Sequence, residues 1–228
     1  MHNIASEVSD IIRETILVLA ALFPIVNPLG SAAIFLNLAG TSDPQMHSIL
    51  SRKIAIYSFF LLVASLLWGV KVLSFFGISI AAVQIGGGLV VAATGWSLLG
   101  QDRGTQKTGQ EEKEGVLDRA FYPLTMPITV GPGSISVAIT LGAHLMGNEG
   151  GVIAFLAPQV LVPALAGVGL VCVIIYLCFR FARAAEQMLG KTGTSVLLRL
   201  SSFILLCIGI QIILTGLHAF LRGGAPIL

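Results

Sequence analysis

The chain of 228 residues is 55% hydrophobic and only 11% charged, with a formal net charge of +2 and a mean hydropathy of +0.93. This composition excludes an ordinary soluble protein, and the small net charge excludes a nucleic-acid partner. The three cysteines lie in apolar stretches without the spacing of metal ligands, so we expect no metal and no cofactor.

Six apolar segments follow one another along the chain. Each is long enough to cross a bilayer, which takes about 20 mostly apolar residues in a helix. We therefore predict an all-α membrane protein in which residues 1–228 form a single transmembrane domain of six helices. The six segments cover residues 15–38, 54–76, 79–100, 120–145, 152–179 and 196–221.

A charged, glycine-containing connector at residues 101–118 separates a first repeat, residues 1–100, from a second repeat, residues 119–228. Basic residues gather in alternate connections, and the positive-inside rule places those connections in the cytoplasm. We therefore expect the 101–118 connector inside and both chain termini outside. The basic residues concerned are Arg52, Lys53, Arg103, Lys107, Lys113, Arg119, Arg180, Arg183 and Lys191.

The two repeats share a motif in their first spans. Residues 23–31 read FPIVNPLGS and residues 122–134 read YPLTMPITVGPGS, and both contain two prolines four residues apart, followed by Gly-Ser. Because three spans is an odd number, similar halves in one chain insert with opposite orientations. The pattern predicts two inverted three-helix repeats, an arrangement typical of secondary transporters.

Helix-breaking residues lie in the middle of the first and fourth spans and predict that helices 1 and 4 are broken. Proline removes an amide donor and glycine loosens the backbone, so free N–H and C=O groups must face protein or a water-filled cavity. New helix ends attract charged groups of a ligand, and a simple proline kink is the alternative. The predicted substrate-binding residues are Asn27, Pro28, Gly30, Ser31, Thr129, Gly131, Pro132, Gly133 and Ser134.

The predicted spans contain no Asp or Glu, which argues against a proton relay through buried carboxylates. A zwitterion or a neutral solute can be held by helix ends and hydroxyls alone. The sequence contains no GxxxxGK[ST] phosphate loop, and its serines and histidines are not placed as a catalytic set, so we expect no enzyme activity.

Three features carry a family resemblance: FPIVNPLGSAAIFLNL at 23–38, YPLTMPITVGPGSISVAITL at 122–141, and the charged central loop in a chain of this length. Together they resemble the MarC family of six-span inner-membrane proteins. Some members of that family are assigned to neutral amino-acid transport, so the resemblance implies an inner-membrane location and a transport function.

The sequence as a whole predicts a secondary transporter of small neutral, zwitterionic amino acids such as glycine or alanine, working by alternating access. Its expected partners are the small-molecule substrate and the lipid bilayer. The sequence leaves open whether a proton or a sodium ion is coupled to transport. Two alternatives remain: an exporter of drugs or other metabolites on the same architecture, and a non-transporting membrane scaffold.

Overall fold

The computed structural model describes residues 4–39, 44–100, 118–146 and 157–222, and it is helical almost throughout these ranges, without strands. The all-α prediction is therefore confirmed for the described residues. The predicted connector at 101–118 lies outside them except for its last residue. In chain order the helices are α1 (Ile4–Val26), α2 (Pro28–Ala39), α3 (Pro44–Phe75), α4 (Ile80–Gly100), η1 (Asp118–Ala120), η2 (Phe121–Thr129), α5 (Pro132–Met146), α7 (Pro158–Arg180) and α8 (Ala182–Arg222).

Five helical segments of the described chain are long and apolar enough to cross a membrane, and η2 with α5 makes a sixth if that bent pair counts as one span. The bend between η2 and α5 is 61°. The six segments agree with the predicted ones within a few residues at most ends. The largest difference is in the second segment, which begins at Gln45 and not at residue 54. The first segment begins at Val8 and not at residue 15, so it contains Asp10 and Glu14 near its start.

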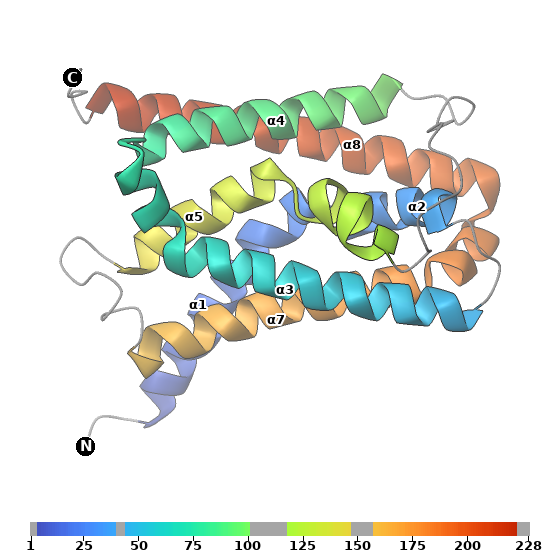
Figure 1. The fold of residues 1–228 in the computed structure, drawn as a ribbon, viewed down its shortest axis with the longest axis horizontal. Coiled ribbons are helices and arrows are strands. Elements are labelled where there is room, and N and C mark those ends of the chain that lie inside the picture. Colours follow the sequence, from blue (N-terminus) through green and yellow to red (C-terminus); the bar gives the residue numbers. More distant parts are fainter. Residues whose placement is uncertain (1–3, 40–43, 101–117, 147–156, 223–228) are drawn as a thin grey trace.

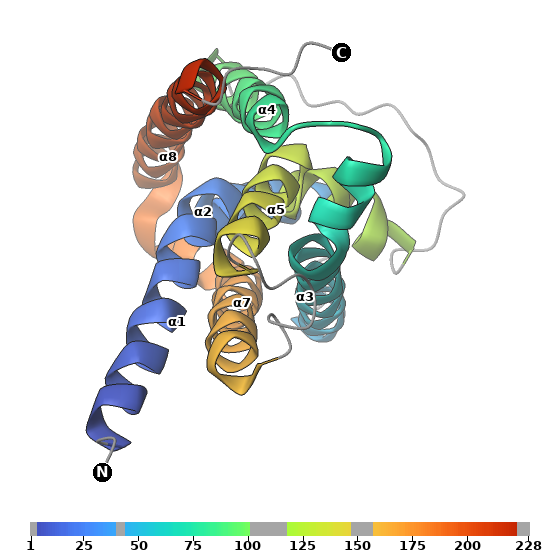
Figure 2. The ribbon, with the colours of Figure 1, turned by 90° about the vertical axis from the view of Figure 1, so that its left-hand side faces the viewer.

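The helices form two layers with a central region between them. Figure 2 shows α4 and α8 side by side on one face, α1, α3 and α7 on the other, and α2 with α5 between the two groups. In Figure 1, α1 and α2 run in the opposite direction to η2 and α5. The pairs α3 with α7 and α4 with α8 also run in opposite directions (Figure 1). Helix α1 begins, and α8 ends, at the same end of the molecule.

Small residues explain the close pairing of α4 with α8, which is the most extensive helix contact of the fold. A methyl group at Gly95 would lie 2.6 Å from the backbone nitrogen of Leu206, and one at Gly209 would lie 2.4 Å from that of Ala92. Neither position has room for a side chain. In a bilayer, where lipid tails are as apolar as leucine, such close backbone approach is a main source of helix association.

Larger side chains join the central region to the other layer. Phe35 of α2 stacks on Phe179 of α7 with ring centroids 4.9 Å apart, and both rings are fully buried. Outward-facing residues are apolar as well: Phe60 is 64% exposed and Trp96 is 71% exposed. An apolar outer surface is what lipid contact requires, so the hydrophobic pattern here serves both the interior and the membrane.

Candidate functional site

The first interruption of the helical backbone lies at Asn27, the single residue between α1 and α2. Its φ is 46°, in the left-handed region that asparagine tolerates better than most residues. The cause is local, because Pro28 disfavours the α conformation of the residue before it and has no N–H of its own. Proline is also well placed as the first residue of α2, where an N–H would have no helical partner.

Asn27 caps the new helix with its own side chain. Its Oδ1 accepts a hydrogen bond from the backbone N–H of Gly30 at 3.2 Å, and its carbonyl accepts one from the N–H of Ser31 at 2.9 Å. A methyl at Gly30 would lie 2.3 Å from Asn27 Nδ2, so glycine is needed for this cap to form. The side chain of Asn27 therefore has a structural partner, and the N-terminus of α2 is partly satisfied.

The second interruption lies at Val130 and Gly131, between η2 and α5. The segment η2 is an irregular, π-type helix in which Tyr122 and Met126 have non-helical backbone angles, and the peptide bonds that follow them, to Pro123 and Pro127, are cis. Two buried hydroxyls of η2 bond to backbone carbonyls: Thr125 Oγ1 donates to the O of Ala120, the last residue of η1, at 2.6 Å, and Thr129 Oγ1 donates to Leu124 O, within η2, at 2.7 Å.

The N-terminus of α5 differs from that of α2 because no asparagine caps it. Pro132 supplies no N–H, and Ile135 is the first residue whose N–H bonds to a preceding carbonyl, that of Gly131 at 3.0 Å. The hydroxyl of Ser134 donates to the same carbonyl at 3.1 Å. The N–H groups of Gly133 and Ser134 thus begin the helix without a backbone or side-chain cap among the described residues.

The two interruptions are in contact. The hydroxyl of Ser31, on α2, lies 3.3 Å from the carbonyl oxygen of Ile128, on η2, and 3.3 Å from that of Val26, the last residue of α1. One hydroxyl hydrogen is shared between two carbonyls at the ends of two helices. Sequence reasoning paired these segments by their motif, and the fold brings them together.

A cavity of about 400 Å³ lies where the interruptions meet. Seven of the nine predicted binding residues line it, while Pro28 and Gly30 do not. Its lining residues are Ile25, Val26, Asn27, Ser31, Ile34, Val90, Val91, Thr94, Leu98, Pro127, Ile128, Thr129, Gly131, Pro132, Gly133, Ser134 and Leu205.

The cavity wall is mainly aliphatic, and no charged side chain lines it among the described residues. Four hydroxyl residues contribute polar groups: Ser31, Thr94, Thr129 and Ser134. Each hydroxyl donates to a backbone carbonyl, Thr94 to Val90 O at 2.8 Å, so their oxygens remain able to accept a hydrogen bond.

The predicted binding residues include none from α4 or α8, and they also omit five lining residues next to the interruptions: Ile25, Val26, Ile34, Pro127 and Ile128. Thr94 has a signal in the sequence, since it is a polar residue inside an apolar span. Val90, Val91, Leu98 and Leu205 have none, because an aliphatic residue facing a cavity looks the same in sequence as one facing lipid or a neighbouring helix.

Gly133 has a packing role that the sequence did not reveal. A methyl built on Gly133 would lie 2.1 Å from Cγ2 of Val91 and 3.4 Å from the carbonyl oxygen of Gly87. A methyl on Gly131 would lie 2.7 Å from the carbonyl oxygen of Pro127. Both glycines therefore allow close approach of backbone within the protein, whatever they do for a ligand.

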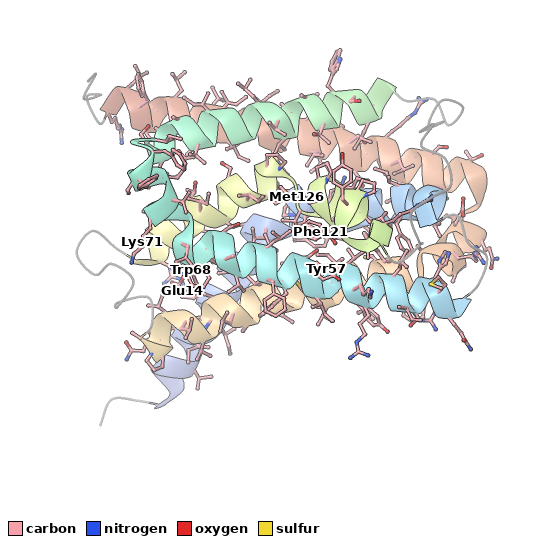
Figure 3. The ribbon with its side chains drawn as sticks, in the orientation of Figure 1. Glu14, Tyr57, Trp68, Lys71, Phe121 and Met126 are labelled. Atoms are coloured by element: carbon pink, nitrogen blue, oxygen red, sulfur yellow. The ribbon has the colours of Figure 1, made fainter. Side chains whose placement is uncertain are left out.

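Charged residues inside the helical segments lie away from this site. Figure 3 places Lys71, Trp68 and Glu14 toward the end of the molecule where α3 ends. Tyr57, on the same helix, instead packs edge-to-face on Phe121 at the start of η2, with ring centroids 5.7 Å apart (Figure 3). Neither Lys71 nor Glu14 lines the cavity.

Comparison with known proteins supplies the family. Residues 12–221 match the family described as MarC family integral membrane protein. The inner membrane protein MarC of Salmonella typhimurium is 32% identical over 224 residues, which cover 93% of this chain and 98% of the relative. Its namesake from Citrobacter koseri is 32% identical over 223 residues, with the same coverage of both chains. No solved structure matches the chain.

Proposed function

Because this chain belongs to the MarC family of integral membrane proteins, we propose that it is a secondary transporter that carries small neutral amino acids such as glycine or alanine through the central cavity. It is a multi-pass inner membrane protein. The observation that carries the proposal is the cavity itself, because residues from both helix interruptions line it together.

The proposal includes an inverted repeat with broken helices 1 and 4. Exchanging the halves would map α1 and α2 onto η2 and α5, α3 onto α7, and α4 onto α8. Each of these pairs runs in opposite directions (Figure 1). The helix contacts follow the same exchange, since α4 packs on α5 and α8 packs on α2. Such a pseudo-twofold arrangement supports alternating access around a central site.

The substrate carboxylate is assigned to the N-terminus of α5. The N–H groups of Gly133 and Ser134 begin that helix, they lie at the cavity, and the positive end of the helix dipole favours an anionic group there. The equivalent end of α2 is a weaker candidate, because Asn27 already occupies the N–H of Gly30. This asymmetry gives the substrate one preferred orientation.

The substrate ammonium is assigned to the hydroxyls and carbonyls that line the same cavity. Hydroxyl oxygens of Ser31 and Thr94 can accept its hydrogen bonds, and so can the carbonyls of Val26 and Ile128 at the helix ends. Without a charged side chain in the lining, a ligand with net charge would be left without compensation in an apolar region. A zwitterion carries its own compensation.

An exporter of larger, apolar compounds is the second candidate, and the aliphatic lining favours it. At about 30 Å³ per water molecule, a cavity of about 400 Å³ has room for roughly a dozen waters, which is more than glycine needs. Large apolar substrates should then bind better than glycine. The transport experiment therefore includes them.

The test is uptake by proteoliposomes of labelled glycine, alanine and an apolar drug panel, with and without sodium or proton gradients. Ligand-dependent thermal stabilisation of the purified protein provides a binding measurement. Glycine and alanine should be transported and should raise the unfolding temperature. Glycinamide and N-acetylglycine, each lacking one charge, should not. Equal behaviour of all four compounds would contradict the zwitterion site, and absence of any uptake would favour a scaffold.

A further inference from the structure

We propose that a groove between α3 and α7, separate from the central cavity, binds one anionic phospholipid, with its phosphate on Arg52 and an acyl chain along the groove. The groove has a volume of about 700 Å³. Its lining combines Arg52 with aromatic and small residues of both helices, among them Phe59, Phe60 and Gly169.

The groove is polar at one end and apolar along its length. Because α3 and α7 run in opposite directions, Arg52 and Tyr176 lie toward one end of the groove, and Phe60 and Gly169 lie toward the other (Figure 1). Eight residues separate Arg52 from Phe60, about 12 Å along a helix. One leaflet of the hydrocarbon core is about 15 Å thick, so the apolar part matches one acyl chain.

The charge of Arg52 selects the headgroup. Its side chain is exposed, and in the described part of the chain it forms no ion pair. A guanidinium group binds phosphate through two parallel hydrogen bonds, and none of the described residues that line the groove is acidic. Tyr176, half-buried at the same end, is a residue type common at the membrane–water boundary.

The groove is open next to Gly169. A methyl group built there would meet no atom within 4 Å, in contrast to Gly167 on the same helix, where it would lie 2.6 Å from Val18. Gly169 therefore serves no close helix contact in this fold. Replacing Gly169 with leucine fills the groove without disturbing the packing of α7. This substitution therefore tests whether a lipid occupies the groove.

The experiment measures binding of dioleoyl phosphatidylglycerol and dioleoyl phosphatidylcholine to the purified full-length protein in detergent, by native mass spectrometry and by thermal stabilisation. The anionic lipid should bind more tightly. Arg52→Gln should weaken its binding about fivefold, the effect of one basic residue near an anionic surface, and remove the preference. Gly169→Leu should weaken both lipids while leaving the unfolding temperature without lipid unchanged.

Lys53→Gln is the matched control, because Lys53 neighbours Arg52 in sequence but does not line the groove. It should keep the preference for phosphatidylglycerol. Equal losses in the Arg52 and Lys53 variants would overturn the proposal in favour of general surface charge. Unchanged lipid binding in Gly169→Leu, accompanied by a change in oligomeric state by light scattering, would also overturn it and assign the groove to a second copy of the chain.

Discussion

Substituting Gly133 with alanine should lower the free energy of unfolding, and a second substitution should restore part of that loss. The new methyl would lie 2.1 Å from Val91 Cγ2, whereas ordinary contact begins at 3.4 Å, so one of the two groups must move by 3.4 − 2.1 = 1.3 Å. Overpacking of this kind costs about 1–3 kcal/mol. Val91 is buried, on a helix held tightly against α8, so it has little freedom to yield.

Val91→Ala removes the obstructing atom. The methyl introduced by Gly133→Ala would then face the Cβ of residue 91 at 3.5 Å and the carbonyl of Gly87 at 3.4 Å, both of them ordinary contacts. Alone, Val91→Ala should cost about 1–3 kcal/mol for two lost methyl groups. The double variant should be more stable than the sum of the single effects predicts, by an interaction energy of about 1–3 kcal/mol.

The assay is reversible unfolding of the four proteins in mixed detergent micelles, followed by circular dichroism. Additive effects of the two substitutions would refute the contact between Gly133 and Val91. The same proteins then separate packing from ligand binding. We expect the double variant to recover stability but not glycine-dependent stabilisation, because its methyl occupies the approach to the N-terminus of α5. Full recovery of both would make Gly133 a packing residue only.

Three further experiments test the helix pairing, the contact between the interruptions and the topology. Gly95→Ala should unfold at a lower temperature than Gly86→Ala. A methyl at Gly95 would lie 2.6 Å from the nitrogen of Leu206, whereas one at Gly86 would meet nothing within 4 Å. Equal unfolding temperatures of the two variants would contradict the α4–α8 contact. Ser31→Ala should cost on the order of 1 kcal/mol in chemical unfolding and should weaken glycine-dependent stabilisation; a variant identical to the parent protein in both would remove Ser31 from the site. A cysteine replacing Gln110, in a background without the native cysteines, should react with a membrane-impermeant maleimide only after lysis, and labelling of intact cells would reverse the proposed orientation.

Positions of the apolar helices could be predicted well from sequence, because the bilayer requires long apolar segments whose backbone is satisfied internally. The backbone leaves helical geometry at Asn27 and at Val130, next to the prolines and glycines from which breaks in helices 1 and 4 were predicted, and the broken helices themselves remain part of the proposal. The start of the first segment was placed too late, at residue 15. The helix includes Asp10 and Glu14, whereas an apolar segment defined by hydropathy begins only after them.

Roles within the site were less predictable. Asn27 was predicted as a binding residue; it lines the cavity, and its side chain also caps α2, a contact that requires Gly30 to lie against it. Thr129 was also predicted as a binding residue; it lines the cavity, but its hydroxyl hydrogen is used within η2. A residue type states which bonds a side chain can form, and the surrounding backbone determines which it does form.

The amino-acid sequence alone was sufficient for the membrane class and the approximate positions of the apolar spans, because both follow from the length and hydrophobicity of local segments. The packing of the helices was needed to show that Ser31 reaches the carbonyl of Ile128, that Val91 packs on Gly133, and that α4 and α8 complete the cavity. The first two contacts join residues that are 97 and 42 positions apart (128 − 31 = 97; 133 − 91 = 42). Their geometry depends on how whole helices pack, and no local pattern in the chain specifies it.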